Sequence, residues 1–214
     1  MIEAIFRRSR SRPLTRGEEQ LARKMFAETL PYGRVRIADF YLPGNNVPVT
    51  LAASPFRRHA GYTIYWGDRD VFGRGADACD GETRVSFVHE LTHVWQGQHH
   101  GRTSQGYMLR SAIAQCRYGA RDVFAARHWH GWAHHRKKAY DYSDKLGQPW
   151  DSFNVEQQAT LVADWFREWQ KNDLEEANQP INDARYAYVS EIIRAGLVIK
   201  ETAAHKSVRV RLPN

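Results

Sequence analysis

A helix predicted between residues 80 and 98 constrains the fold more than any other feature of this sequence. Its apolar side chains recur at helical spacing and form one stripe, which consists of Phe87, Val88, Leu91, Val94 and Trp95. A second stripe, on a different side, is polar and consists of Ser86, His89, Glu90, His93 and Gln96. Such a helix packs its apolar stripe against the core and presents its polar stripe to a site or to solvent.

The polar stripe contains the pattern H-E-x-x-H, from His89 to His93. Two histidines four residues apart project from the same side of a helix, so both imidazoles can bind one metal ion. Zinc bound in this way lowers the pKa of a bound water to about 7, and a Glu beside the first His can take the proton of that water without binding the metal. The pattern therefore predicts a zinc-dependent hydrolase, in particular a metallopeptidase, with Glu90 as its general base.

A catalytic zinc also needs a third protein ligand and one open position. His99 follows His89 at the spacing of the longer pattern H-E-x-x-H-x-x-G-x-x-H, but position 96 is Gln where that pattern has the Gly that breaks the helix. Glu156 stands near the start of a later predicted helix, and a carboxylate from a later helix is the third ligand in thermolysin-like enzymes. An ordinary first-turn Glu that favours the helix dipole would look the same. Both candidates remain open on these grounds.

The rest of the chain predicts an α+β fold, in which a small meander of strands precedes the helices. Capping boxes at Thr15 with Glu18 and at Asn154 with Gln157 predict the starts of two helices. We expect strands at residues 35–41, 47–53 and 62–66, with a strong turn signal at residues 43–46. Helices are expected at residues 15–30, 80–98, 107–118, 154–170 and 181–195, and a short strand at residues 207–212.

Arginine is concentrated near the N-terminus, where residues 1–13 are interpreted as a basic arm ahead of a single domain at residues 14–214. The whole chain carries a net charge of +7, which permits contact with nucleic acid or with an acidic partner. The alternative function is therefore a basic nucleic-acid- or partner-binding module with a structural or degenerate zinc site. The intact Glu90 and the absence of RRM, KH and zinc-finger patterns argue against this alternative, so nucleic acid is not an expected partner.

No segment approaches the ~18 consecutive apolar residues that span a bilayer, and the N-terminal basic residues are not followed by the apolar region of a Sec signal. We therefore expect synthesis in the cytoplasm without a membrane span. The two cysteines, Cys79 and Cys116, do not form a CxxC pair, which excludes a Cys-rich zinc site. A disulfide between them and two separate thiols both remain open.

Histidine is frequent between residues 127 and 150, a stretch that is also rich in Trp and Gly. A loop near the mouth of the site or a surface patch is favoured, with a second metal site as the alternative, for a group that comprises His128, His130, His134 and His135. A zinc peptidase also needs a donor for the developing oxyanion, often Tyr or His. The candidates for that donor, which precede Glu156 in the chain, are Tyr140, Tyr142 and His130.

Two blocks of the sequence resemble a known family. They read FVHELTHVWQ at residues 87–96 and NVEQQA at residues 154–159. Both are similar to the zinc-metallopeptidase domains found at the C-terminus of some VgrG spike proteins, and to stand-alone Vgr-related proteins. This family is associated with the bacterial type VI secretion system. The Val-Trp-Gln that follows H-E-x-x-H is the most specific part of the resemblance.

The resemblance implies a zincin-like metallopeptidase fold of the gluzincin kind. In such a fold zinc would be held by His89, His93 and Glu156, with Glu90 as the base. The resemblance further implies a protein or peptide substrate, the role of an antibacterial effector, and export by a type VI route. The partners it implies are a component of the secretion apparatus or an immunity protein.

One position departs from the thermolysin-like pattern. Those enzymes carry an Asp four residues after the ligand Glu, where it supports a zinc-binding His. Thr160 stands at that place here, and the next acidic residue is Asp164. Support for a zinc-binding His is therefore expected to come from elsewhere in the chain.

Overall fold

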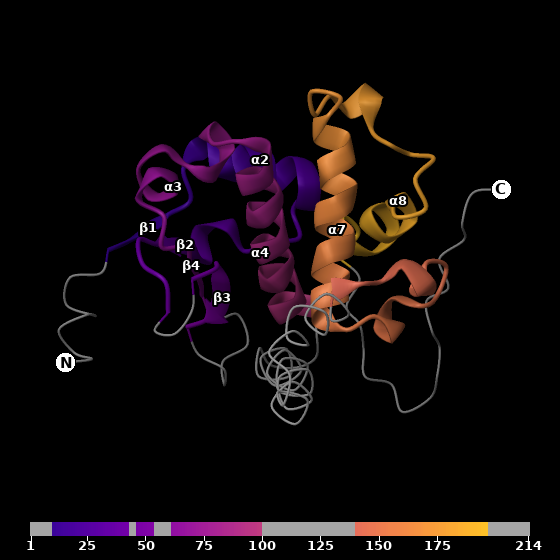
Figure 1. Cartoon of the computed structure of the whole chain (residues 1–214), viewed down its shortest axis with the longest axis horizontal. Helices are drawn as coiled ribbons and strands as arrows, with labels where there is room; N and C mark the ends of the chain where they lie inside the picture. The colour runs from indigo at the N-terminus through magenta and orange to yellow at the C-terminus, as the bar shows by residue number, and fades with distance from the viewer. Residues whose placement is uncertain (1–9, 43–45, 54–60, 100–139, 197–214) are drawn as a thin grey trace, which may run out of the picture.

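The computed structural model describes residues 10–42, 46–53, 61–99 and 140–196, which form an α+β fold (Figure 1). The strands are β1 (Ser11–Pro13), β2 (Val35–Ala38), β3 (Val49–Ala52) and β4 (Tyr62–Tyr65). The helices are α2 (Arg16–Phe26), α3 (Arg69–Arg74), α4 (Gly81–His99), α7 (Val155–Gln170) and α8 (Tyr186–Tyr188), and the π-helical turn η6 (Val189–Ile193) follows α8 directly. Short 3-10 turns are η1 (Tyr32–Arg34), η2 (Ala76–Ala78), η3 (Ser143–Lys145), η4 (Trp150–Ser152) and η5 (Glu176–Asn178).

The strands form one sheet in the order β1-β2-β4-β3, so the predicted meander is wrong. Strand β4 lies between β2 and β3, parallel to β2 and antiparallel to β3, with Ile64 opposite both Ile37 and Thr50. A two-residue turn would force β2 and β3 to pair directly. The linker of residues 39–48 is longer, and β3 can therefore reach the far side of β4.

The helix bounds follow the predicted start signals closely. The capping boxes of Thr15 and Asn154 are both formed, at the starts of α2 and α7. Helix α2 ends at Phe26, before the expected residue 30, because Ala27 adopts a positive φ of 47°. The helix expected at residues 181–195 is shorter, because the Asp183 carboxylate accepts the backbone N–H of Arg185 and holds a turn ahead of α8. The helix predicted at residues 107–118 and the strand predicted at 207–212 lie outside the described residues.

The last residues of the predicted basic arm belong to the folded part of the chain. Strand β1 pairs antiparallel with β2, and the guanidinium of Arg12 forms a bidentate ion pair with Glu18, at 2.6 and 3.0 Å. Glu18 is fully buried and also accepts the backbone N–H groups of Thr15 and Ala76. A buried carboxylate needs such partners, because its desolvation is costly without them. Arg12 is therefore a partly buried member of the folded chain, whereas residues 1–9 lie outside its described part.

Helix α4 lies between the sheet and α7, so its apolar stripe and most of its polar stripe are buried (Figure 1). On the sheet side, the rings of Phe87 and Trp66 lie 6.1 Å apart. On the other side, the polar stripe is covered as well, and Glu90, His93 and Gln96 are nearly inaccessible to solvent. These three residues of the polar stripe are thus enclosed inside the molecule, whereas His89 is partly exposed and Ser86 is exposed. Among the described helices, none has the length and apolar character that crossing a membrane requires.

Gly97 lets α4 approach β4 closely. A Cβ atom at this position would lie 2.6 Å from the hydroxyl oxygen and from Cε1 of Tyr62, closer than such atoms approach in proteins. Tyr62 is itself 1% exposed, so its ring has little space into which it could move. The absence of a side chain at position 97 therefore sets the distance between the helix and the sheet.

We expect Gly97→Ala to lower the free energy of unfolding by about 1–3 kcal/mol, because the added methyl group overpacks the contact with Tyr62. Helix propensity alone would predict the opposite sign, a gain of about 1 kcal/mol. Gly73→Ala is the matched control, since Gly73 is an exposed residue of α3 and a Cβ there meets no atom within 4 Å. Denaturant unfolding of the two variants should give changes of opposite sign. Equal stabilisation of both would contradict this interpretation of Gly97.

Candidate metal centre

Helices α4 and α7 bring three predicted ligands together. The Nε2 atom of His89 lies 3.4 Å from Oε2 of Glu156, and the Nε2 atom of His93 lies 3.5 Å from the same oxygen. The two imidazole rings meet edge to face, with their centroids 4.9 Å apart. Their spacing of four residues on α4 places both on the side of the helix that α7 covers. The Asn154 cap starts α7 so that Glu156 lies in its first turn.

The three donor atoms fit a zinc ion by their chemistry and by their separation. Two imidazole nitrogens and one carboxylate oxygen are a ligand set that catalytic zinc sites use. Zinc bonds of about 2.0–2.1 Å at tetrahedral angles hold neighbouring donor atoms about 3.4 Å apart. The observed 3.4 and 3.5 Å match that spacing and exceed the usual length of a hydrogen bond, about 2.7–3.2 Å. Each imidazole nitrogen is therefore spaced from the Glu156 carboxylate as a second zinc ligand would be.

The charges of these groups are strongly coupled. Burial alone would raise the pKa of Glu156, but the neighbouring His93 and His89 outweigh it and hold the pKa of this carboxyl well below its usual range. Burial alone would lower the pKa of His93, but the negative charge of the nearby Glu156 carboxylate raises it to about 9. The Glu156 carboxylate thus stabilises positive charge on the imidazole that faces it. A divalent cation bound between the three donor atoms would be stabilised by the same negative charge.

Glu90 lies beside these residues but is held differently. Ligand atoms of His89, Glu90 and His93 all lie within 4.8 Å of one another, so distance alone does not separate a ligand from a base. The Thr50 hydroxyl, which comes from β3, donates to Oε2 of Glu90 at 2.6 Å. A hydrogen bond to one carboxylate oxygen fixes the orientation of the carboxylate. Glu90 is therefore tied to the sheet, whereas Glu156 lies directly against the two imidazoles.

The support for His93 comes from a residue that sequence reasoning passed over. Nδ1 of His93 lies 2.8 Å from Oε1 of Gln96, one helical turn later on α4. The expected position for such support, Thr160, has a buried hydroxyl without a hydrogen-bond partner among the described residues, and Asp164 bonds to Tyr142 instead. The signal in the sequence was the place of Gln96 in the polar stripe, one helical turn after His93, from which no role as a partner of His93 was inferred.

His99 does not join the cluster. Helix α4 continues through Gln96 to His99, so the last residue of the helix lies well beyond the H-E-x-x-H turns. Nδ1 of His99 lies 2.8 Å from the carbonyl oxygen of Trp95, and its ring stacks on the Trp95 indole with the centroids 4.4 Å apart. Of the two candidates for the third ligand, the structure brings only Glu156 to His89 and His93.

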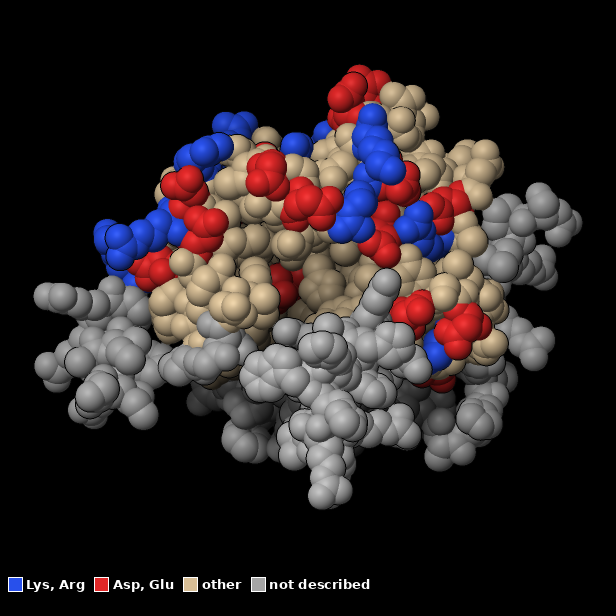
Figure 2. Space-filling view, in the orientation of Figure 1, with Lys and Arg blue, Asp and Glu red and all other residues tan. Residues whose placement is uncertain are grey.

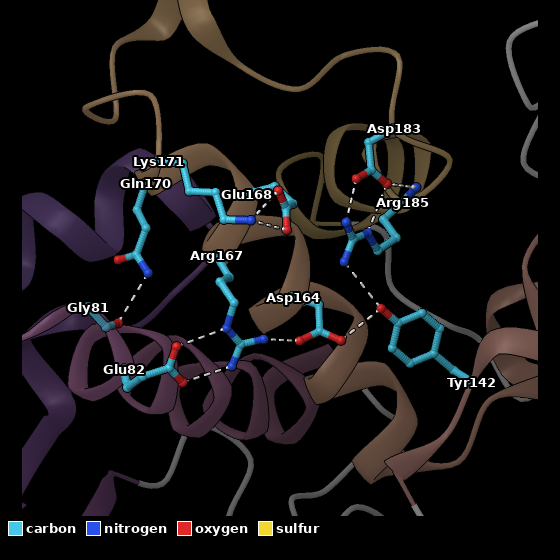
Figure 3. A network of polar contacts seen from close by, with 10 residues as sticks. All are labelled: Gly81, Glu82, Tyr142, Asp164, Arg167, Glu168, Gln170, Lys171, Asp183 and Arg185. Atoms are coloured by element: carbon cyan, nitrogen blue, oxygen red, sulfur yellow. Dashed lines mark hydrogen bonds and ion pairs between the residues drawn. The ribbon is translucent and has the colours of Figure 1, made fainter.

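A network of ion pairs and hydrogen bonds joins α4, α7 and Tyr142 (Figure 3). Arg167 on α7 bonds through both sides of its guanidinium, to Glu82 on α4 and to Asp164. Asp164 in turn accepts the Tyr142 hydroxyl at 2.9 Å. Burial raises the pKa of Tyr142 to about 12, so this hydroxyl remains a donor. Tyr142 is therefore anchored on the flank of α7.

Of the residues predicted as oxyanion donors, Tyr142 already donates its hydroxyl to Asp164. Tyr142 directs its hydroxyl into the network, whereas the ring of Tyr140, two residues earlier, lies 6.2 Å from the His89 ring between centroids. Tyr140 is thus the member of the predicted group that the described structure brings to the centre. His130 and the histidines at 128, 134 and 135 lie outside the described residues, as does Cys116. Cys79 is free and directs its thiol to the Gly75 carbonyl oxygen at 3.3 Å.

We expect Glu156→Ala to lose bound zinc and His99→Ala to keep it. Glu156 contributes the oxygen that both imidazoles face, whereas His99 is bonded to its own helix. Zinc per chain is measured by elemental analysis after dialysis against micromolar zinc. Circular dichroism controls for folding, since lost metal can also reflect lost structure. A folded His99→Ala variant without zinc, together with a loaded Glu156→Ala variant, would reverse the ligand assignment.

Comparison with known proteins gives one sequence relative and one related structure. No protein-family model matches the chain. Over 170 residues, 78% of its length, the chain is 29% identical to the type VI secretion system spike protein VgrG2b of Pseudomonas aeruginosa, and it spans only 14% of that protein. The effector domain of Pseudomonas aeruginosa VgrG2b matches with a TM-score of 0.52 and 23% sequence identity, over 79% of this chain and 81% of that domain. The chain therefore shares its fold with the VgrG2b effector domain.

Proposed function

We propose that this chain is a zinc-dependent metallopeptidase that acts as an effector of a type VI secretion system. The proposed peptidase activity is supported by the two imidazoles of His89 and His93, which lie 3.4 and 3.5 Å from one oxygen of Glu156, with Glu90 beside them. A zincin-like fold is part of the proposal, because the helix with H-E-x-x-H and the later helix with the Glu ligand follow that plan.

The residues around the centre have separate roles in the proposed peptide hydrolysis. Zinc bound here would polarise the scissile carbonyl and make water acidic. Glu90 takes a proton from the attacking water and later passes it to the leaving amine. The Thr50 hydroxyl keeps the Glu90 carboxylate oriented for both transfers. Tyr140, whose ring lies near that of His89, is the candidate donor to the developing oxyanion.

The secretion half of the proposal is supported by the similarity to VgrG2b. That protein is a spike protein of the type VI secretion system, and one of its parts is an effector domain. This chain corresponds to the effector domain in length and fold, since the match covers 81% of that domain. The proposed substrate is a protein or peptide, and the proposed route of export is the type VI apparatus.

A nucleic-acid-binding module finds no specific support among the described residues. On the face drawn in Figure 2, basic side chains are interspersed with acidic ones instead of forming one patch. A nucleic-acid surface needs a continuous basic area that neutralises phosphates. Several of the arginines on the described surface are also engaged in ion pairs, including Arg23, Arg167 and Arg185.

We expect Glu90→Gln to abolish hydrolysis while zinc stays bound. The loss of a general base costs about 10²–10⁴-fold in rate or more, whereas the three ligands remain in place. The assay uses a proteome-derived peptide library, with cleavage read by mass spectrometry and zinc content read by elemental analysis. Cleavage by the zinc-loaded wild-type chain is the positive control. Retention of most of the wild-type cleavage in Glu90→Gln would contradict the enzyme proposal.

The secretion proposal predicts that release of the chain into the culture medium depends on a working type VI apparatus. The tagged chain is followed by immunoblotting in the source cell and in a matched strain whose type VI sheath has been deleted. A cytoplasmic marker protein controls for lysis. Equal amounts of the chain in both media would rule out this route, and would leave the hydrolase proposal to be judged by the cleavage assay.

A further inference from the structure

Two buried glutamines form a continuous chain of hydrogen bonds behind the candidate metal centre. Gln96 on α4 directs Oε1 to Nδ1 of His93 at 2.8 Å, and Gln158 on α7 directs Oε1 to Nε2 of Gln96 at 2.9 Å. Nε2 of Gln96 also donates to the carbonyl oxygen of Val155 at 2.8 Å, and Nε2 of Gln158 donates to that of Trp150 at 2.9 Å. Both glutamines are buried, at 0% and 2% exposure.

Backbone carbonyl groups fix the direction of every bond in this chain, because a carbonyl oxygen can only accept. The carbonyl oxygens of Trp150 and Phe153 accept from Gln158, so the amide nitrogen of Gln158 faces them and its oxygen faces Gln96. Gln96 must then present its nitrogen to Gln158, a choice that the Val155 carbonyl also requires. The oxygen of Gln96 is left for His93. Nδ1 of His93 is therefore the protonated nitrogen, and Nε2 is the one that faces Glu156.

We propose that Gln96, held by Gln158, is a positioning residue that orients the His93 ring and selects its metal-binding tautomer; the inference rests on the proposed zinc site. A metal-ligating His usually donates its second ring N–H to an acceptor that fixes the ring in this way. Here the acceptor is a neutral amide, and its own orientation is set by a second helix.

The same chain of bonds also fixes the third ligand relative to the first two. Val155 and Gln158, which accept from Gln96, lie on either side of Glu156 in the first turn of α7. A displacement of Gln96 would therefore disturb the orientation of His93 and the register of α7 against α4 together. Gln158 acts on the centre through its bond to Gln96.

The test measures zinc affinity rather than turnover, so it needs no substrate. We expect Gln96→Met to raise the Kd for zinc about 10–100-fold, measured by competition with a chromogenic chelator, as is typical when such a supporting acceptor is lost. Gln158→Met should raise the Kd by a smaller factor, because the Val155 carbonyl still holds Gln96. Met matches the length of Gln and removes only its hydrogen bonds.

Gln98→Met is the matched control, since Gln98 lies on the same helix and donates to the Tyr62 hydroxyl at 3.0 Å, away from the ligands. It should leave the Kd for zinc unchanged. Nitrogen-15 NMR of the zinc-loaded chain supplies a readout that general loss of stability would not move. It should detect one His93 tautomer with a slowly exchanging Nδ1 proton in the wild type and in Gln98→Met, and faster exchange in Gln96→Met.

The outcomes separate this inference from the proposed function. A wild-type chain that binds no zinc would overturn the zinc site itself. A wild-type chain that binds zinc, with an unchanged Kd and an unchanged Nδ1 proton in folded Gln96→Met, would overturn only the role of Gln96. If Gln96→Met does not fold, the test relies on the Kd of Gln158→Met for zinc. A Kd of that variant equal to the wild-type value overturns the inference.

Discussion

The contact between α4 and α7 is the constraint on which the rest of this structure depends. Helix α4 lies between the sheet and α7, so most of its side chains, apolar and polar, are removed from water. Burial of apolar side chains against the sheet stabilises the fold in the ordinary way. Burial of His93, Glu90 and Gln96 does not by itself stabilise the fold. These polar groups lose their hydrogen bonds to water, and only well-placed protein partners can replace those bonds. The partners come from α7 and β3.

This arrangement couples the metal centre to the packing of the molecule. The carboxylate of Glu156 would be costly to bury alone, and the same holds for charged imidazoles. Together they compensate one another, and a zinc ion would add bonds that exist only when α4 and α7 are docked. The buried polar residues of α4, which would destabilise an ordinary apolar core, are therefore the ones that the proposed chemistry uses.

The sequence predicted the parts of this site that local spacing determines. The H-E-x-x-H spacing, the two capping boxes and the continuation of α4 past Gln96 all follow from rules that act over a few residues. The placement of β4 between β2 and β3 could not be predicted in this way, because it depends on which strands pair across a long linker. The bonds from Thr50 to Glu90 and from Gln96 to Gln158 join residues far apart in the chain, and single-sequence periodicity contains no signal for either.

The ion pair between Arg12 and Glu18 bears on where a shortened version of this protein can begin. Composition alone suggests a cut after residue 13, which would discard the arginine-rich segment as a dispensable tail. Such a fragment would keep the Glu18 carboxylate in the interior without its cation, and unpairing a buried charge costs about 3–5 kcal/mol. It would also remove the strand that covers the outer edge of β2. Fragments for expression or crystallisation therefore need to start before residue 11, even though the composition of that segment resembles a flexible tail.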